Sequence, residues 1–136
     1  DARTVDGVTR VYFVSKSAKR LLILDLAQQT VEFSSTVSGA FNRQPDQIKI
    51  IAGSEMVYFC EDGGNDCGVH ARDEEGNFYS ILDGPAYNTE TTGLAFSPDH
   101  KHMYVIFQGG GQLFEITRDD GYAFNAQSLD IKYHAD

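Results

Sequence analysis

The sequence predicts an all-β fold in which one sheet unit recurs about three times, in the manner of β-propeller blades. Three runs share one pattern of aromatic and aliphatic residues: residues 11–14, 57–60 and 103–106. Their tyrosines, Tyr12, Tyr58 and Tyr104, are separated by 46 residues, and the same interval separates Ile48 from Leu94. A period in the forties is typical of a four-stranded propeller blade. Helical repeats of that length lack such β-forming runs, so the alternative is a chance alignment of strand-forming residues.

We expect the first blade at about residues 8–37, with its own first strand missing because residues 1–7 are polar. Its strands are expected at residues 9–16, 20–26 and 29–36. The second blade is expected at about residues 46–83, with strands at residues 47–52, 55–61, 68–73 and 77–82. The segment Glu74-Glu75-Gly76 joins the last two of these and is typical of a hairpin turn.

The third blade is expected at about residues 91–134. Its first hairpin turns at residues 97–100, because Pro98 fixes its own φ and cannot donate to a ladder, while Asp99 can bond nearby backbone. The three glycines at 109–111 make the second turn. They do not form a phosphate loop, because no Lys-Ser/Thr pair follows them. Later strands are expected at residues 112–118 and 128–133.

Three blades cannot close a ring, and an open arc leaves unpaired sheet edges. We therefore expect residues 1–136 to form one partial propeller domain. Its partner is the rest of the propeller, supplied by the same polypeptide or by another chain.

The composition favours cations over anionic partners. The chain of 136 residues has the size of one domain and carries 20 Asp plus Glu against 11 Lys plus Arg, a net charge of -9. Such a chain repels nucleic acid phosphates and anionic membrane surfaces. It contains no apolar run long enough to span a membrane. No signal peptide is visible, but a mature chain would have lost one, and we expect export to the periplasm or the extracellular space.

Acidic residues next to two strands are the candidate metal ligands. Glu61 and Asp62 end the second strand of the second blade, and Glu90 precedes the first strand of the third. Inner strands and their loops line the channel of a propeller, so these carboxylates would converge there. Hard oxygen ligands suit calcium, which takes six to eight of them. The alternative is that Asp62, with Asn65 and Asp66, makes a solvated turn.

The two cysteines leave two possibilities open. Cys60 ends an apolar strand, where it would be a small buried hydrophobic side chain. A disulfide to Cys67 would form only in an oxidising compartment, and two thiols are the alternative. No CxxC pair indicates a zinc site. His70 is a candidate ligand, and no Ser/His/Asp set follows from the order of residues in the chain.

Several motifs together resemble those of the PhoX-type alkaline phosphatases, in particular the algal branch of that family. The resemblance runs from about Val11 to His134 and is most specific in YFCEDGG at 58–64 and ETTGLAFSPD at 90–99. It also includes GVHAR at 68–72, TRDDG at 117–121 and KYH at 132–134. SPD alone is common in propellers, whereas the acidic Gly-Gly segment together with ETTG is more specific.

The resemblance implies a six-bladed propeller whose channel holds calcium and iron ions that bind and hydrolyse phosphomonoesters. This chain would be its C-terminal half. Glu61 and Glu90 match acidic residues that the family uses on its metals, and Asp62 is adjacent to one of them. The cysteine that holds iron in the family would be expected in the other half, so Cys60 is not assigned that role.

Two functions from different classes follow. The first is an enzyme, the C-terminal part of a calcium- and iron-dependent phosphomonoesterase. The second is a non-catalytic propeller that serves as a scaffold or binding module. Alone, the chain is not expected to hydrolyse a substrate.

Overall fold

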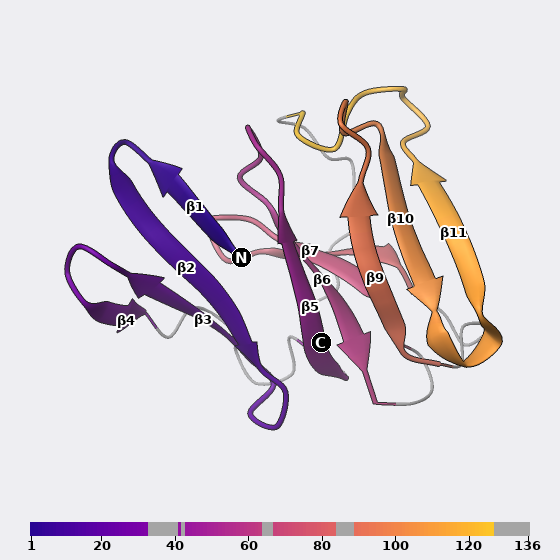
Figure 1. Ribbon diagram of the computed structural model, residues 1–136, viewed down its shortest axis with the longest axis horizontal. Coiled ribbons are helices and arrows are strands. Elements are labelled where there is room, and N and C mark those ends of the chain that lie inside the picture. Colours follow the sequence, from indigo (N-terminus) through magenta and orange to yellow (C-terminus); the bar gives the residue numbers. More distant parts are fainter. Residues whose placement is uncertain (33–40, 42, 64–66, 84–88, 127–136) are drawn as a thin grey trace.

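The computed structural model consists of three antiparallel β-sheets and one short 3₁₀ helix (Figure 1). The structure describes residues 1–32, 41, 43–63, 67–83 and 89–126. The first sheet contains β1 (Ala2–Val5), β2 (Val8–Ser15), β3 (Arg20–Asp25) and β4 (Thr30–Glu32). The second contains β5 (Gln44–Ile50), β6 (Val57–Asp62), β7 (Val69–Arg72) and β8 (Phe78–Leu82). The third contains β9 (Thr91–Phe96), β10 (His102–Phe107) and β11 (Gln112–Thr117), with η1 (Gln108–Gly110) before the last strand. The predicted all-β class is confirmed.

The 46-residue interval marks equivalent places in the three sheets. Tyr12, Tyr58 and Tyr104 lie on β2, β6 and β10, which are the second strands of their sheets. Ile48 and Leu94 lie on β5 and β9, the first strands of the second and third sheets. In each sheet the strands that follow one another in sequence are also neighbours in space. The repeat therefore corresponds to three sheets of one kind, each formed from a continuous segment of chain.

The expectation that the first strand of the first sheet is missing is wrong. β1 pairs with β2 from Ala2 opposite Val11 to Val5 opposite Val8. Asp6 and Gly7 join the two strands with φ of 50° and 79°, which are the positive values that a two-residue hairpin loop requires and that Asp-Gly favours. The polar, mostly exposed β1 shows no hydrophobic alternation, so the Asp-Gly pair was the available signal.

Some expected features lie outside the described residues. These are the strand at residues 128–133, the end of the strand expected at residues 29–36, and residues 65 and 66 of the acidic loop. The third sheet accordingly has three described strands. The three-glycine turn is present, as η1 followed by Gly111 with a φ of 58°.

The central strand β6 is buried on both sides, because sheets pack against both of its faces. Tyr58 and Cys60 belong to the core between the second and third sheets, together with Met103 and Val105. Val57 and Phe59 belong to the core between the first and second sheets, together with other apolar residues: Tyr12, Leu21, Ile23, Phe41 and Phe78. Alternate side chains of a strand point to opposite faces, so even-numbered residues of β6 face the third sheet and odd-numbered residues face the first.

The second sheet lies between the first and the third. In Figure 1, β4 lies at one side of the molecule and β11 at the other, with β5 between them. The first strand of the second sheet, β5, contacts both β2 and β9. The ends of β2 and β6 and the start of β9 lie at the lower end of the molecule in this view. In the part of the chain that the structure describes, no helix is long and apolar enough to cross a membrane.

Candidate metal centre

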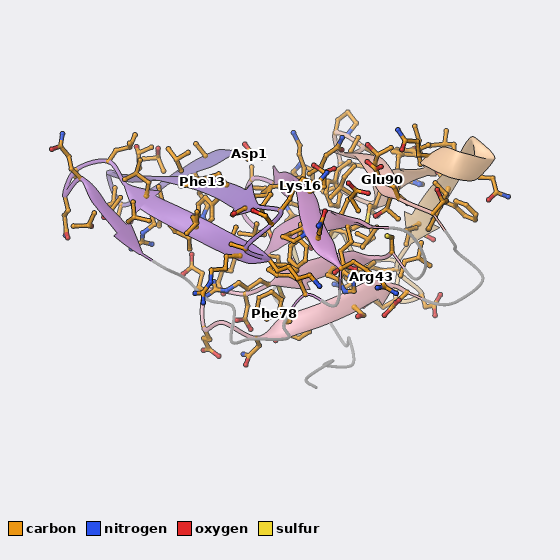
Figure 2. The ribbon with its side chains drawn as sticks, turned by 90° about the horizontal axis from the view of Figure 1, so that it is seen from below. Asp1, Phe13, Lys16, Arg43, Phe78 and Glu90 are labelled. Atoms are coloured by element: carbon orange, nitrogen blue, oxygen red, sulfur yellow. The ribbon has the colours of Figure 1, made fainter. Side chains whose placement is uncertain are left out.

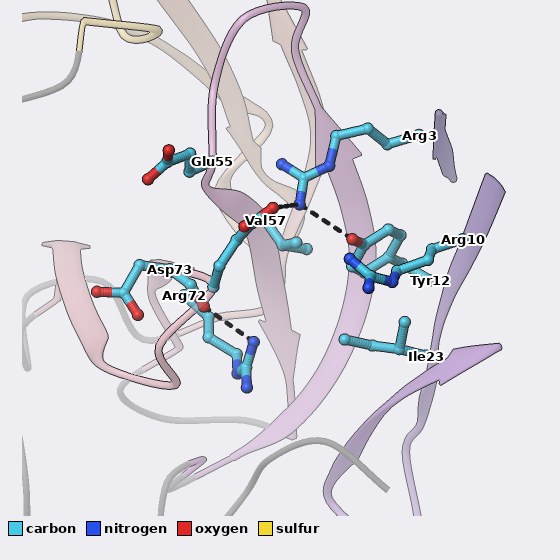
Figure 3. Close-up of a pocket in the computed structure, with 9 residues that line it drawn as sticks. Arg3, Arg10, Tyr12, Ile23, Glu55, Val57, Arg72 and Asp73 are labelled. Carbon is cyan, nitrogen blue, oxygen red and sulfur yellow. Dashed lines mark hydrogen bonds and ion pairs between the residues drawn. The ribbon is translucent and has the colours of Figure 1, made fainter. Parts of the chain in front are cut away.

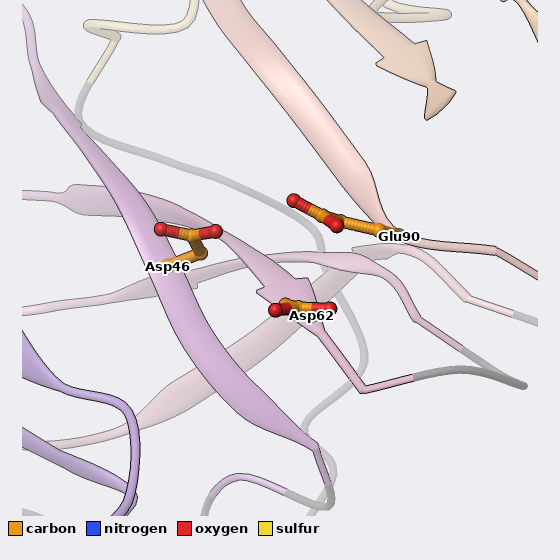
Figure 4. A group of neighbouring side chains, drawn as sticks. All are labelled: Asp46, Asp62 and Glu90. Carbon is orange, nitrogen blue, oxygen red and sulfur yellow. The ribbon is translucent and has the colours of Figure 1, made fainter. Parts of the chain in front are cut away.

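Three carboxylates from different strands converge at this lower end of the sheets. Asp46 belongs to β5, Asp62 ends β6, and Glu90 immediately precedes β9 (Figure 4). One oxygen atom of each lies within 4.8 Å of one oxygen atom of each of the others. The two predicted ligands Asp62 and Glu90 are thus brought together, and Asp46 joins them.

A buried threonine holds β9 beside the end of β6. The hydroxyl of Thr91 donates to the carbonyl oxygen of Gly68 at 2.7 Å and accepts from the backbone N–H of Glu61 at 3.0 Å. Thr91 is fully buried. Because Thr91 follows Glu90 and Glu61 precedes Asp62, this link sets the two carboxylates side by side. The hydrogen bond from the N–H of Gln108 to the Glu90 carbonyl, 2.9 Å long, fixes the other side of the Glu90 backbone.

The sequence does not predict Asp46 as a member of this cluster, because the position of Asp46 depends on strand register. Gln44 pairs with Asp62 and Pro45 with Glu61, and the register shifts between Pro45 and Ile48. Such a bulge re-aims the side chains near it. The sequence shows an acidic residue after a proline, but it does not show which residue of β6 lies opposite.

Lys16 brings a positive charge to the carboxylates from the first sheet. Its Nζ atom lies 2.6 Å from Oδ2 of Asp62 and 3.1 Å from Oδ2 of Asp46. Figure 2 labels Lys16 and Glu90 on the same side of the molecule, well away from Phe78. The hydrogen bond to Asp62, followed by that to Asp46, raises the pKa of Lys16. All three sheets therefore contribute to one charged cluster.

The pKa values of Asp62 and Glu90 are shifted in opposite directions. The hydrogen bond from Lys16 lowers the pKa of Asp62 below its usual range. Partial burial, followed by repulsion from Asp62 and Asp46, raises the pKa of Glu90. With every group ionised, the three acids carry three negative charges and Lys16 offsets one of them. The excess negative charge is least compensated at Glu90.

The cluster has the chemistry of a hard-cation site. Its donor atoms are all carboxylate oxygens, and three carboxylates can supply up to about six of the six to eight oxygens that calcium takes. Thiolate and imidazole donors, which favour softer transition metals, are absent from this group of described residues. The residues present fit calcium, and Lys16 already contacts two of the three carboxylates.

Glu61 lies in a different environment from its neighbour Asp62. It is 1% exposed and, as an odd-numbered residue of β6, points to the other face of the sheet. Its Oε1 accepts from the backbone N–H of Arg43 at 3.1 Å, and its Oε2 lies 3.0 Å from Nε2 of His70. The structure thus places this predicted ligand in a hydrogen-bonded network inside the second sheet.

The two cysteines are buried. No disulfide joins Cys60 to Cys67, both of which are described and buried. Burial raises the pKa of the Cys60 thiol to about 12. A thiol in that state is a poor metal ligand and a poor nucleophile.

No family model, no curated protein and no solved structure matches the chain.

Proposed function

We propose that this chain is part of a PhoX-type, metal-dependent phosphomonoesterase and contributes carboxylate ligands to its central metal site. One observation carries the proposal: Asp46, Asp62 and Glu90 come from three separate segments, and their oxygen atoms converge within 4.8 Å. Two of these residues belong to the segments that carry the strongest family resemblance, residues 58–64 and 90–99.

The proposal includes a larger propeller, in which the three sheets are three of the six blades that the family resemblance implies. The apolar outer surfaces of the first and third sheets support it. Phe13 and Val31 lie on the face of the first sheet that points away from the second, and they are 40% and 44% exposed. Ile106 and Leu113 pair on the outer face of the third sheet, and Leu113 is 67% exposed. Further blades, from the same polypeptide or another chain, would cover such faces.

In this proposal Asp46, Asp62 and Glu90 hold calcium at the end of the channel. Iron is proposed only because the family resemblance implies it, and its ligands would belong to the rest of the propeller. Bound metal ions would neutralise the charge of the phosphate group and activate a nucleophile. The carboxylates of this chain would hold the metal in place, and Lys16 would withdraw from Asp62 to make room for it.

The test is phosphatase activity of the intact protein on a simple phosphomonoester, with and without a calcium chelator. We expect chelation to abolish hydrolysis and calcium to restore it. Glu90→Gln and Asp62→Asn should each reduce activity by about tenfold or more, because each removes a charged ligand. Glu75→Gln, an exposed glutamate in the β7–β8 turn, is the matched control and should be neutral. Activity that survives both chelation and Glu90→Gln contradicts the proposal.

A non-catalytic scaffold is the second candidate, and the position of Lys16 favours it. An ammonium group already bridges Asp46 and Asp62, so the cluster is partly compensated without a metal ion. A scaffold of this kind would show no turnover of any phosphomonoester and no calcium-dependent change in melting temperature. Saturable calcium binding that is lost in Glu90→Gln would exclude a scaffold that binds no metal ion.

A further inference from the structure

An arginine-lined pocket lies between the first and second sheets, at the end of the strands opposite to the carboxylates. Val57 begins β6 and lines the pocket, whereas Asp62 ends that strand in the acidic cluster. The pocket has a volume of about 260 Å³. Three of the six arginines of this acidic chain line it: Arg3, Arg10 and Arg72. In Figure 3 their side chains extend into the space between the two sheets.

Strand register places two of these arginines directly opposite each other. Arg3 of β1 pairs with Arg10 of β2, and Tyr12 lies on the same face two residues further along. Like charges at directly opposite positions destabilise a sheet. A nearby negative charge would therefore stabilise this pair of arginines.

Carboxylates flank both of these arginines. Asp25 of β3 lies directly opposite Arg10 in the strand register, but no ion pair joins the two, and its Oδ1 accepts from the backbone N–H groups of Ala27 and Gln28. Glu74 forms an ion pair with Arg3. The Asp73 side chain accepts hydrogen bonds from Asn77 and from the Tyr79 hydroxyl. The exposed Glu55 lies on the other side of the pocket from Arg10 in Figure 3.

Arg10 is half-buried, and no hydrogen bond or ion pair of its guanidinium with another described residue is found. We propose that the pocket binds the phosphate group of a small anionic ligand, with Arg10 as its principal contact. A guanidinium presents a planar fork of N–H donors that matches two oxygens of such a group.

Neighbouring groups complete the site. The Tyr12 hydroxyl accepts from Nη2 of Arg3 at 3.0 Å, so its own hydrogen can be donated to the ligand. Arg72, which donates through Nη1 to the backbone carbonyl of Asp73, also lines the pocket. Ile23 and Val57 are 6% and 2% exposed and form an apolar wall, which strengthens charge interactions beside it.

The pocket volume and charge define the class of ligand. Organic ligands of drug size fill about 300–1,000 Å³, so a pocket of about 260 Å³ accepts phosphate itself or a small phosphate ester. A phosphate dianion offers more charge and more acceptor oxygens than a carboxylate to the guanidinium of Arg10 and the hydroxyl of Tyr12. Because the carboxylate cluster lies at the opposite end of β6, binding here does not require a metal.

The test is calorimetric titration of the intact protein with inorganic phosphate at low ionic strength and pH 8, with a chelator present. We expect saturable binding that Arg10→Gln weakens by at least about tenfold and Tyr12→Phe by several-fold. Arg20→Gln removes an exposed arginine of the same sheet and should leave the affinity unchanged. As a folding control, the melting temperature should rise with phosphate in the wild-type protein and not in Arg10→Gln.

Three results would overturn the proposal. These are no phosphate binding to the wild-type protein, equal binding by Arg10→Gln, and binding of acetate as tight as that of phosphate. Because a chelator is present, failure here is distinct from failure of the proposed metal site. Loss of phosphatase activity on chelation with phosphate binding retained supports both proposals.

Discussion

Nε2 of His70 lies 3.0 Å from Oε2 of the buried Glu61. On the other side of the same ring, Nδ1 lies 3.0 Å from the hydroxyl oxygen of Ser80. The three side chains form a row across β6, β7 and β8, and the ring of Phe59 stacks on His70 with centroids 5.8 Å apart. A carboxylate, an imidazole and a hydroxyl also form the triad of serine hydrolases. We interpret this row as structural, because both oxygens of Glu61 are bonded within its own sheet and its neighbouring loop.

Replacing Glu61 should destabilise the protein much more than replacing an exposed glutamate. Glu61→Ala leaves the Arg43 N–H and the His70 ring without their acceptor, and we expect a loss of about 2–3 kcal/mol in the free energy of unfolding. Glu61→Gln keeps one acceptor oxygen and should cost less. Urea denaturation measures both. Glu75→Ala is the control and should change the free energy by less than about 0.5 kcal/mol; equal effects at the two positions would contradict a structural role.

The hydroxyl of Thr91 should be more important than its methyl group. Thr91→Val keeps the shape but removes the hydrogen bonds to Gly68 and Glu61, at an expected cost of about 1–2 kcal/mol. Thr91→Ser keeps the hydroxyl and should preserve the position of Glu90 relative to Asp62. Calcium titration of both variants, beside their unfolding curves, is the measurement. If calcium affinity is weakened as much by the serine as by the valine, the hydroxyl does not position the cluster.

The pair between Lys16 and Asp62 should stabilise the fold only while Asp62 is ionised. Its pKa is lowered in the folded state, so the contribution is present above the unfolded pKa of about 4 and is lost as the pH falls through the lower folded value. Lys16 is 43% exposed, and solvent screening limits the coupling to less than about 1 kcal/mol. A double-mutant cycle with Lys16→Met and Asp62→Asn at pH 7 and near pH 2 gives that energy. A coupling that is unchanged in acid, or insensitive to 1 M salt, would contradict this account.

Tyr58 should make the protein less stable at alkaline pH. Its hydroxyl donates to the carbonyl of Phe124 at 2.7 Å, and burial raises its pKa to about 12. An unfolded tyrosine ionises near pH 10, so unfolding releases a proton between these values and stability falls as the pH rises from about 10 to 12. Tyr58→Phe should reduce that slope and cost about 1 kcal/mol at pH 7. The pH dependence of the melting temperature of both proteins is the check, and identical slopes would count against it.

The sequence carries enough information to predict the three sheets and part of the carboxylate cluster. The tyrosines 46 residues apart located the second strand of each sheet, because strand formation depends on local alternation and turn residues. Asp62 and Glu90 were found because each lies beside a predicted strand: Asp62 ends β6, and Glu90 immediately precedes β9. β1 was missed, since a polar strand with exposed side chains has no hydrophobic signal.

By itself, the sequence determined an all-β chain of repeated sheet units with excess acidic charge near two strand ends. Only the tertiary structure decided which acids meet. Adjacent residues of a strand face opposite sides, so Glu61 and Asp62 separate once sheets pack on both faces of β6. The register of β5 brings Asp46 to Asp62, and Lys16 reaches them from the first sheet. These contacts join residues far apart in the chain, so their positions follow from sheet packing and not from local sequence preferences.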